Sequence, residues 1–349
     1  MLTQLTARSG VRGHDEPPER AGFLFRPSKV LVHGRVQARP QGVAGGHEMK
    51  IVRGSFVVVL ALAAASASGA GEYFDPSYDV SVTEDIVYGQ AINARGLEEI
   101  LYLDLYRPAT EGTPLASRPT VVFAHGGSFK NGHRKVAEIN PYLRDMAARG
   151  WTMASINYRL RPVGTTGSKP NHELIVEAAL GDSDTLRDAH HDMLAAVRFL
   201  RANAGAYGVD PDRIAVGGSS AGAVTALQAA INTEDPGTSG TADESSDVAA
   251  AVSVSGAADP DHIEPGDPPF YMIHGGMDTT VPAVLGQQAC AIATAMLNGC
   301  EHHFFPSDGH TPWSDWNDYV VQTSARFLCH VMLADIADCG DRALPLTLG

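Results

Sequence analysis

The sequence predicts an α/β layer fold, in which a mostly parallel sheet of about eight strands carries helices on both faces. Short apolar runs alternate along the chain with longer segments of helical periodicity, which is the pattern of a sheet covered by helices. The chain has 349 residues, of which 44% are hydrophobic and 19% charged, so it can bury a large core. We expect residues 71–349 to form a single domain, because no repeat or linker divides them.

A secretory signal peptide is expected at residues 49–70. Two positively charged residues precede the apolar run from Phe56 to Ala65, and small residues follow it. Cleavage is expected after Ala67 or Ala70, and an uncleaved N-terminal anchor is the alternative. The apolar run is shorter than the ~20 residues of a membrane span.

Residues 1–48 are expected to be a non-native or disordered leader, with translation starting at Met49. The whole chain has a formal net charge of −14, and loss of residues 1–70 would make it more acidic still. An acidic surface repels nucleic-acid phosphates and anionic lipid. We therefore expect no nucleic-acid partner and no stable membrane insertion after signal cleavage.

Four cysteines lie in the last third of the chain, and an even number in an exported protein favours disulfides. Of the three possible connectivities we favour the local pairs Cys290–Cys300 and Cys329–Cys339. A helix that continued from Cys290 to Asn298 would place these residues ~12 Å apart. Bridged Cα atoms lie only ~4.4 to 6.8 Å apart. The first pair therefore requires that this helix ends early, and otherwise the pairing differs.

Strands are predicted in order along the chain. Period-two alternation predicts an opening hairpin of edge strands at residues 84–92 and 99–108. Apolar runs predict buried strands at residues 120–124, 152–158, 213–217, 249–255 and 270–273, and a last strand at 302–306.

Helices are predicted between these strands. Apolar residues recur at helical spacing from Ala189 to Leu200, a second helix is expected to begin at Ser220 and a third at Pro282, and residues 314–336 read as a terminal helix. Two irregular stretches, residues 161–184 and 233–247, are expected to be functional walls or mobile loops.

The stretch "RIAVGGSSAGAV" (213–224) contains two adjacent serines where a strand passes into a helix. The pattern G-x-S-x-G fits only with Ser220 at its centre, flanked by Gly218 and Gly222. A sharp turn of this kind exposes its apex side chain at the carboxyl edge of the sheet. Ser220 is therefore the candidate nucleophile, and the alternative is a turn in which Ser220 only caps the helix.

A serine needs a base, and the base needs an orienting acid. In this order of elements the acid and then the histidine follow the serine along the chain. Asp278 follows the strand at 270–273 and His310 follows the last strand, so both are expected at the same edge of the sheet as Ser220. We predict that Asp278 orients His310 and that His310 takes the proton of Ser220.

Other acids and histidines in this region are weaker candidates. His302 and His303 lie inside the last strand and are expected to be structural. Asp308 is expected to form a turn. Asp259 and Asp261 come one strand too early, which makes them weaker rivals for the acid.

Donors for the negative charge on the substrate carbonyl are expected in "FAHGGSF" (123–129), which also ends a strand. We predict an oxyanion hole from the backbone amides of Gly126, Gly127 and Ala221. His125 is expected to hold this loop by hydrogen bonding. The second "HGG", residues 274–276, is expected to serve tight loop geometry and is assigned no catalysis.

From about Asp85 to Leu333 the chain resembles α/β-hydrolase serine esterases of the H-G-G-x carboxylesterase and lipase branch. The segments "HGGSF", "INYRLRP", "AVRFLRANAGAYGVDPDRIAVGGSSAGA", "IHGGMDTTVP" and "DGHTPW" occur in that family's order. The chain is most similar to secreted, lid-poor members that cleave feruloyl and acetyl esters on plant polysaccharide. This resemblance implies the α/β-hydrolase fold, a triad of Ser220, Asp278 and His310, and no metal or organic cofactor. Ser128 stands where many relatives have a third glycine.

The expected function is a secreted hydrolase that cleaves short-chain or polymer-borne carboxylic esters through an acyl-enzyme. Residues 256–269 are too few for a helical lid, so the site is expected to be open, which suits small or polymer-borne substrates. Lys130 is expected to face solvent. Two alternatives remain: a serine peptidase of the same fold, for which the chain lacks room for a gating domain, and a non-catalytic binding module.

Overall fold

The computed structural model describes residues 72–161, 170–180, 184–241, 243–335, 337 and 339. The predicted leader and signal peptide lie outside these described residues, so their assignment stays a prediction. The chain divides into the units Met1–Ala63 and Ala64–Gly349, and all described residues belong to the second. Within the described ranges, no helix is long and apolar enough to cross a membrane.

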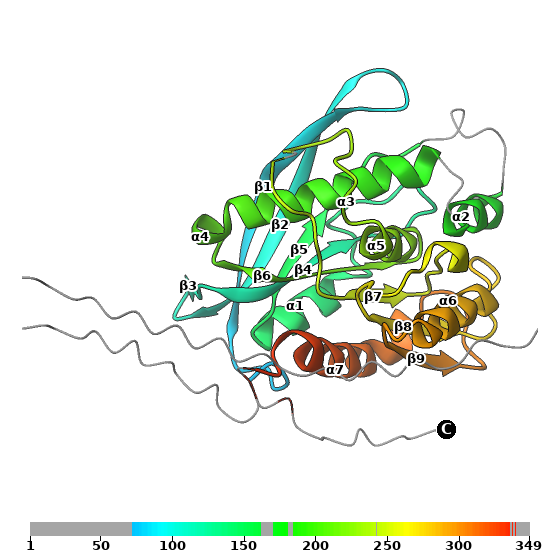
Figure 1. The fold of residues 1–349 in the computed structure, drawn as a ribbon. Coiled ribbons are helices and arrows are strands. Elements are labelled where there is room, and N and C mark those ends of the chain that lie inside the picture. Colours follow the sequence, from blue (N-terminus) through cyan, green and yellow to red (C-terminus); the bar gives the residue numbers. More distant parts are fainter. Residues whose placement is uncertain are drawn as a thin grey trace, which may run out of the picture. The chain divides into compact units, whose positions relative to one another are not determined.

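One nine-stranded sheet forms the centre of the second unit (Figure 1). Its strands are β1 (Asp79–Ile92), β2 (Glu98–Thr110), β3 (Thr113–Pro114), β4 (Arg118–Ala124), β5 (Thr152–Ile156), β6 (Val209–Ser219), β7 (Ala251–Val254), β8 (Phe270–Gly275) and β9 (Cys300–Phe305). They lie in the order β1-β2-β5-β4-β6-β7-β8-β9, and β3 pairs with β2. Neighbours from β5 to β9 are parallel, whereas β1–β2 and β2–β5 are antiparallel.

Helices cover both faces of the sheet, as predicted (Figure 1). They are α1 (Asn140–Ala148), α2 (Asn171–Ala179), α3 (Asp184–Ala202), α4 (Ala204–Tyr207), α5 (Ala221–Ile231), the 3-10 helix η1 (Pro260–His262), α6 (Ala283–Ala295) and α7 (Trp313–Met332). The side chains of α2, α3, α5 and α6 pack into one hydrophobic core, and those of α1 and α7 into a second core on the opposite face. The fold is the α/β-hydrolase fold.

The prediction that β2 is an edge strand was wrong, because β2 lies between β1 and β5. Its alternation suggested one solvent-facing side. On that side, however, Asp104 is fully buried and accepts a hydrogen bond from Arg134 Nε at 2.9 Å. A buried ion pair therefore gave this interior strand the sequence pattern of an exposed one.

Three short α-helices and the 3-10 helix η1 were not predicted. The segment from residue 161 to 184 was expected to be irregular, yet it contains α2 and the first residue of α3. Helix α1 had a sequence signal, because Pro141 stands at its start and buried apolar residues follow it. The four-residue helix α4 ends at Gly208, whose φ of 68° suits glycine.

Both preferred disulfides are present. Cys290 on α6 is bonded to Cys300 on β9, with 5.4 Å between their Cα atoms. The helix meets the expected condition, since α6 ends at Ala295 and the left-handed residues Leu297 and Gly299 turn the chain back. Cys329 and Cys339 form the second bridge, with Cα atoms 5.6 Å apart.

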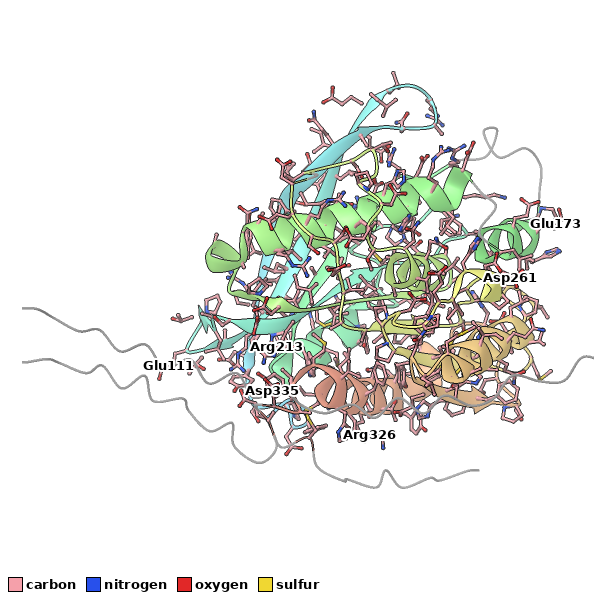
Figure 2. The ribbon with its side chains drawn as sticks, in the orientation of Figure 1. Glu111, Glu173, Arg213, Asp261, Arg326 and Asp335 are labelled. Atoms are coloured by element: carbon pink, nitrogen blue, oxygen red, sulfur yellow. A yellow bond between two sulfur atoms is a disulfide. The ribbon has the colours of Figure 1, made fainter. Side chains whose placement is uncertain are left out.

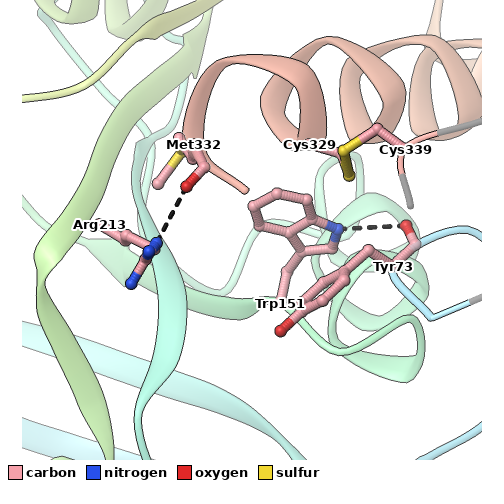
Figure 3. Close-up of a disulfide and its surroundings, with 6 residues drawn as sticks. All are labelled: Tyr73, Trp151, Arg213, Cys329, Met332 and Cys339. Carbon is pink, nitrogen blue, oxygen red and sulfur yellow. Dashed lines mark hydrogen bonds between the residues drawn. A yellow bond between two sulfur atoms is a disulfide. The ribbon is translucent and has the colours of Figure 1, made fainter. Parts of the chain in front are cut away.

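Two kinds of contact hold the end of α7 in place: the Cys329–Cys339 disulfide and hydrogen bonds to the sheet (Figure 3). Arg213 on β6 donates from Nε to the carbonyl of Met332 at 2.9 Å. The same guanidinium donates to Asp335 at 2.8 Å, and Figure 2 shows these two side chains next to each other. Trp151 donates from Nε1 to the carbonyl of Tyr73 at 3.3 Å, which fastens the beginning of the described chain beside this bridge.

Candidate active site

The functional segments all follow parallel strands that end at one edge of the sheet. The glycine loop follows β4, Ser220 follows β6, Asp278 follows β8 and His310 follows β9. Parallel strands bring their carboxyl ends together, and ligand sites of open α/β sheets lie there. The topology therefore gathers segments from four parts of the chain.

Ser220 sits at a strained turn between β6 and α5, with φ 55° and ψ −119°. A non-glycine residue rarely adopts positive φ unless its surroundings enforce it. Glycines on both sides make the turn possible. A Cβ at Gly218 would lie 2.2 Å from the backbone of Gly222, and a Cβ at Gly222 would lie 2.2 Å from the carbonyl of Ala124.

The two adjacent serines point in different directions. Ser220 Oγ lies 2.8 Å from His310 Nε2. Ser219 is buried, and its Oγ accepts a hydrogen bond from Trp313 Nε1 at 3.1 Å. Trp313 packs against Phe123 and Tyr142. Ser219 thus bonds to the aromatic cluster around Trp313, and of the two serines only Ser220 contacts His310.

His310 bridges the serine and the acid. Its Nδ1 lies 2.7 Å from Asp278 Oδ2, while its Nε2 faces Ser220. The amide of the next residue, Thr311, donates to Ser255 Oγ at 3.1 Å, which anchors the histidine loop to the end of β7. The structure therefore brings together the three side chains that the sequence placed at this edge.

Asp278 is held by donors on both carboxylate oxygens. The amides of Thr280 and Val281 donate to Oδ1 at 2.8 and 2.9 Å. His310 Nδ1 and His274 Nε2 lie 2.7 and 3.2 Å from Oδ2. Burial alone would raise the pKa of Asp278, but hydrogen bonds from His274 and His310 outweigh it and hold the pKa well below its usual range. The donors around Asp278 therefore favour its ionised form.

The loop after β8 and the loop that carries His310 are joined by backbone contacts. Gly276 donates to the carbonyl of Phe305 at 2.7 Å, and Met277 donates to that of Asp308 at 2.8 Å. A Cβ at Gly275 would lie 2.1 Å from the carbonyl of Gly309. The second "HGG" thus serves the tight loop geometry that we expected.

The glycine loop after β4 lies against the serine. A Cβ at Gly126 would be 3.2 Å from Ser220 Cβ. Gly127, with φ 123°, turns the loop, and its carbonyl accepts from Lys130 and Asn131. Among the described residues, no backbone hydrogen bond uses the amides of Gly126 or Gly127. Ala221 is the first residue of α5, a position whose amide has no partner within its helix.

Two aromatic contacts hold this loop in place. His125 Nδ1 lies 2.6 Å from the carbonyl of Gly126, which agrees with the expected role of pinning the loop. The His125 ring stacks on the Tyr158 ring, with 4.5 Å between the ring centroids. The Tyr158 hydroxyl donates to the His125 carbonyl at 2.8 Å. Ser128, in place of the third glycine, is buried and adopts φ 55°.

The weaker candidates lie in other surroundings. His303 bonds to Tyr319 at 2.7 Å and to Glu301 at 2.8 Å, as a structural residue would. The amide of Asp308 closes a turn onto Phe305. Asp259 caps η1 by accepting from the amide of Asp261. In the described residues, none of these acids contacts His310.

Sequence reasoning missed His274 and Trp313. His274 stands four residues before Asp278, and its contact with the acid depends on how the loop after β8 folds back. Trp313 reaches Ser219 across 94 positions of sequence. The first contact had a weak signal in the repeated "HGG" motif, and the second had none.

Comparison with known proteins agrees with this fold. The model of the carboxylesterase family matches residues 78–259, just over half of the chain. The chain belongs to the carboxylesterase family. The matched region contains the glycine loop and Ser220 but ends before Asp278 and His310. The assignment of the acid and the base therefore depends on the geometry described above.

Individual relatives match over a limited part of their length. Bile salt-activated lipase of Mus musculus is 32% identical over 152 residues, 42% of this chain and 22% of that protein. Neuroligin-like protein glit-1 of Caenorhabditis elegans is 29% identical over 128 residues, 37% of this chain and 15% of that protein. The chain thus spans less than a quarter of the length of these relatives.

A solved structure covers more of the chain. An esterase from Thermogutta terrifontis with butyrate bound superposes with a TM-score of 0.54 at 21% identity, over 73% of this chain and 95% of that one. At this identity the likeness shows the fold.

Proposed function

We propose that this chain hydrolyses carboxylic esters through an acyl-enzyme on Ser220. The observation that carries the proposal is the unbroken hydrogen-bond chain from Ser220 Oγ through His310 to Asp278, at 2.8 and 2.7 Å. A serine, an imidazole and a carboxylate joined in this way form the arrangement that activates a hydroxyl for acyl transfer. Family membership and the esterase-like fold support the same reaction.

The steps follow from the positions of these groups. Ser220 Oγ attacks the ester carbonyl carbon while His310 Nε2 takes the hydroxyl proton. The oxygen that becomes negative is received by the amides of Gly126, Gly127 and Ala221. His310 then protonates the leaving alcohol, and Asp278 stabilises the imidazolium throughout. Water attacks the acyl-enzyme with His310 as base, which releases the acid and restores Ser220.

Substitution of each serine tests this proposal, with p-nitrophenyl acetate as substrate. Ser220→Ala should lower kcat by at least about 10⁴-fold, because the nucleophile is lost. Ser219→Ala, the matched control, should keep kcat within about 10-fold, since it removes only one hydrogen bond from Trp313. Near-normal turnover by the Ser220 variant would overturn the proposal.

We further propose that the substrates are short-chain or polymer-borne esters, such as acetyl or feruloyl groups. Within described residues 256–269, the only helix is the three-residue η1, which leaves no helical lid between β7 and β8. A pocket lined by Asn93, Ala94, Arg95, Glu99, Lys130 and Leu160 includes Lys130, three residues after Gly127. Esters of increasing acyl length, acetylated xylan and methyl ferulate would test this preference; highest turnover on long-chain acyl esters would contradict it.

We propose export as well. Two disulfides among the described residues suit an oxidising compartment. N-terminal sequencing of protein from the culture medium should give a chain that begins after Ala67 or Ala70. Recovery of a chain that begins before Met49 would contradict both the signal peptide and the proposed start.

A further inference from the structure

Two histidines on α3 and a carboxylate on the α5–β7 loop (residues 232–250) come together in the structure. His190 and His191 are buried on α3, and Asp235 lies on the loop. One possible ligand atom from each residue lies within 4.8 Å of those of the other two. His191 Nε2 and Asp235 Oδ2 are 3.1 Å apart. Figure 1 shows this loop running over α3.

These distances suit a zinc ion. Zinc binds imidazole nitrogen and carboxylate oxygen at about 2.0–2.2 Å, so two ligands of a tetrahedral ion lie about 3.4 Å apart. The pair at 3.1 Å is already close to this separation. The three candidate ligand atoms lie at most 4.8 Å apart, so side chains need to move together by about 1.5 Å or less to reach the zinc separation.

The remaining ring nitrogens already face oxygen atoms. His190 Nε2 lies 2.9 Å from the carbonyl of Asn232, to which it can donate. His191 Nδ1 lies 3.1 Å from Thr238 Oγ1. Histidines that bind a metal usually donate their other N–H to an oxygen, which fixes the tautomer and the ring orientation. In the metal-free chain His191 Nε2 donates to Asp235 Oδ2, so a metal ion would replace the proton between these two atoms, whereas His190 keeps its other ring nitrogen for the ion.

Asp235 is also held in position. Its Oδ1 accepts from the amide of Gly237 at 2.8 Å, which leaves Oδ2 directed at His191. The loop around it is fastened to α3 by Arg198, which donates to the carbonyls of Asp235 at 3.3 Å and Pro236 at 3.0 Å. The carboxylate therefore does not depend on a metal to reach the histidines.

We propose that His190, His191 and Asp235 bind one zinc ion, which ties the α5–β7 loop to α3. This proposal does not depend on the proposed ester hydrolysis and is tested separately from it. Its effect would be on the stability of the loop, because a ligand that binds only the folded state stabilises that state.

Zinc titration of the tag-free, chelator-treated full chain tests the proposal. Calorimetry should show one zinc ion per chain with micromolar or tighter affinity, and zinc should raise Tm. X-ray absorption should show nitrogen and oxygen ligands at about 2.0–2.1 Å, including two imidazoles. Asp235→Asn, which keeps the acceptor for Gly237, should weaken binding by at least about 10-fold.

A matched control is the exposed His262, which pairs with the partly buried Asp259 at 3.2 Å. His262→Asn should leave zinc affinity unchanged. Absence of stoichiometric binding to the folded wild-type chain would overturn the proposal, as would unchanged affinity in both Asp235→Asn and His191→Gln. His191 would then serve only as a hydrogen-bonded bridge between Thr238 and Asp235.

Discussion

The tripeptide His-Gly-Gly occurs twice in this chain, each time where a strand ends, and the two copies make different contacts. In the first, after β4, Gly126 lies against Ser220, and the amides of Gly126 and Gly127 make no backbone hydrogen bond among the described residues. In the second, at the end of β8, Gly276 donates to Phe305, and Gly275 lies against the carbonyl of Gly309.

The histidines differ in the same way. His125 lies 2.6 Å from the carbonyl of its own neighbour, Gly126, and so shapes the loop that carries it. His274 reaches Val281 at 2.9 Å and Asp278 at 3.2 Å, and so supports the acid. Both copies pack closely on the protein's own backbone, but only the first leaves its two glycine amides without a backbone partner among the described residues. What packs against the motif decides its role.

The largest expected effect comes from Asp278, the acid that follows the second His-Gly-Gly. Asp278→Asn should lower kcat by about 10⁴-fold, because an amide cannot stabilise the imidazolium and favours the wrong tautomer of His310. Steady-state hydrolysis of p-nitrophenyl acetate measures it, with circular dichroism to confirm the fold. Asp308→Asn, two residues from His310, is the control and should behave like the wild type. Equal activity of the two variants would remove Asp278 from the mechanism.

A methyl group added to the first His-Gly-Gly should lower kcat by a smaller factor. Gly127→Ala would place a Cβ 2.0 Å from the carbonyl of Asn131, at a φ of 123° that side chains rarely adopt. The loop must shift, and loss of an aligned amide should lower kcat by about 10²–10³-fold. Gly205→Ala is the control, because nothing lies within 4 Å of its Cβ. A Gly127 variant with kcat within twofold of wild type would exclude this loop from oxyanion binding.

The histidine of the first segment should make stability depend on pH. Burial lowers the pKa of His125 to about 4, whereas an unfolded histidine has a pKa of about 6.5. Between these values the unfolded chain binds a proton that the folded chain does not. Stability is therefore full above pH 6.5 and falls as the pH drops towards 4.

Urea unfolding at pH 7.5 and pH 5 measures this loss. Between these two pH values, the free energy of unfolding of His125→Asn should fall by about 2 kcal/mol less than that of the wild type. His262→Asn, at a side chain that is 62% exposed, should keep the wild-type difference. If His125→Asn also kept it, the buried neutral imidazole would not be the cause.

The histidine of the second segment should have the smallest effect. His274→Leu removes a donor from Asp278 and should lower kcat about 10-fold with little change in KM. His274→Gln, which restores a donor, should recover most of the activity. A stability loss with unchanged kcat would make His274 a packing residue only.

The parts of the fold that could be predicted are those with a local signal. Apolar runs located the buried strands, and the turn residues after β4, β6, β8 and β9 placed the candidate site at one edge. The edge position expected for β2 was wrong because Asp104 is buried with Arg134, and burial of an ion pair leaves no mark on an alternating pattern. The short helix α1 buries Tyr142, Leu143, Met146 and Ala147, so packing stabilises it more than its own sequence does.

Within the site, Ser220, Asp278 and His310 could be named from their motifs and their order. Contacts made across the fold could not. The partner of Ser219 is Trp313, and that of the Thr311 amide is Ser255, 56 positions away. These contacts depend on how separate loops meet at the sheet edge, which spacing along the chain does not specify.

Covalent trapping of the nucleophile tests the central claim most directly. A fluorophosphonate ester should react with the folded wild-type chain, and peptide mass spectrometry should find the adduct on Ser220, with labelling strongly slowed by His310→Gln. Ser219→Ala should label as the wild type does. An adduct on Ser219, or no adduct on a folded chain, would contradict the account.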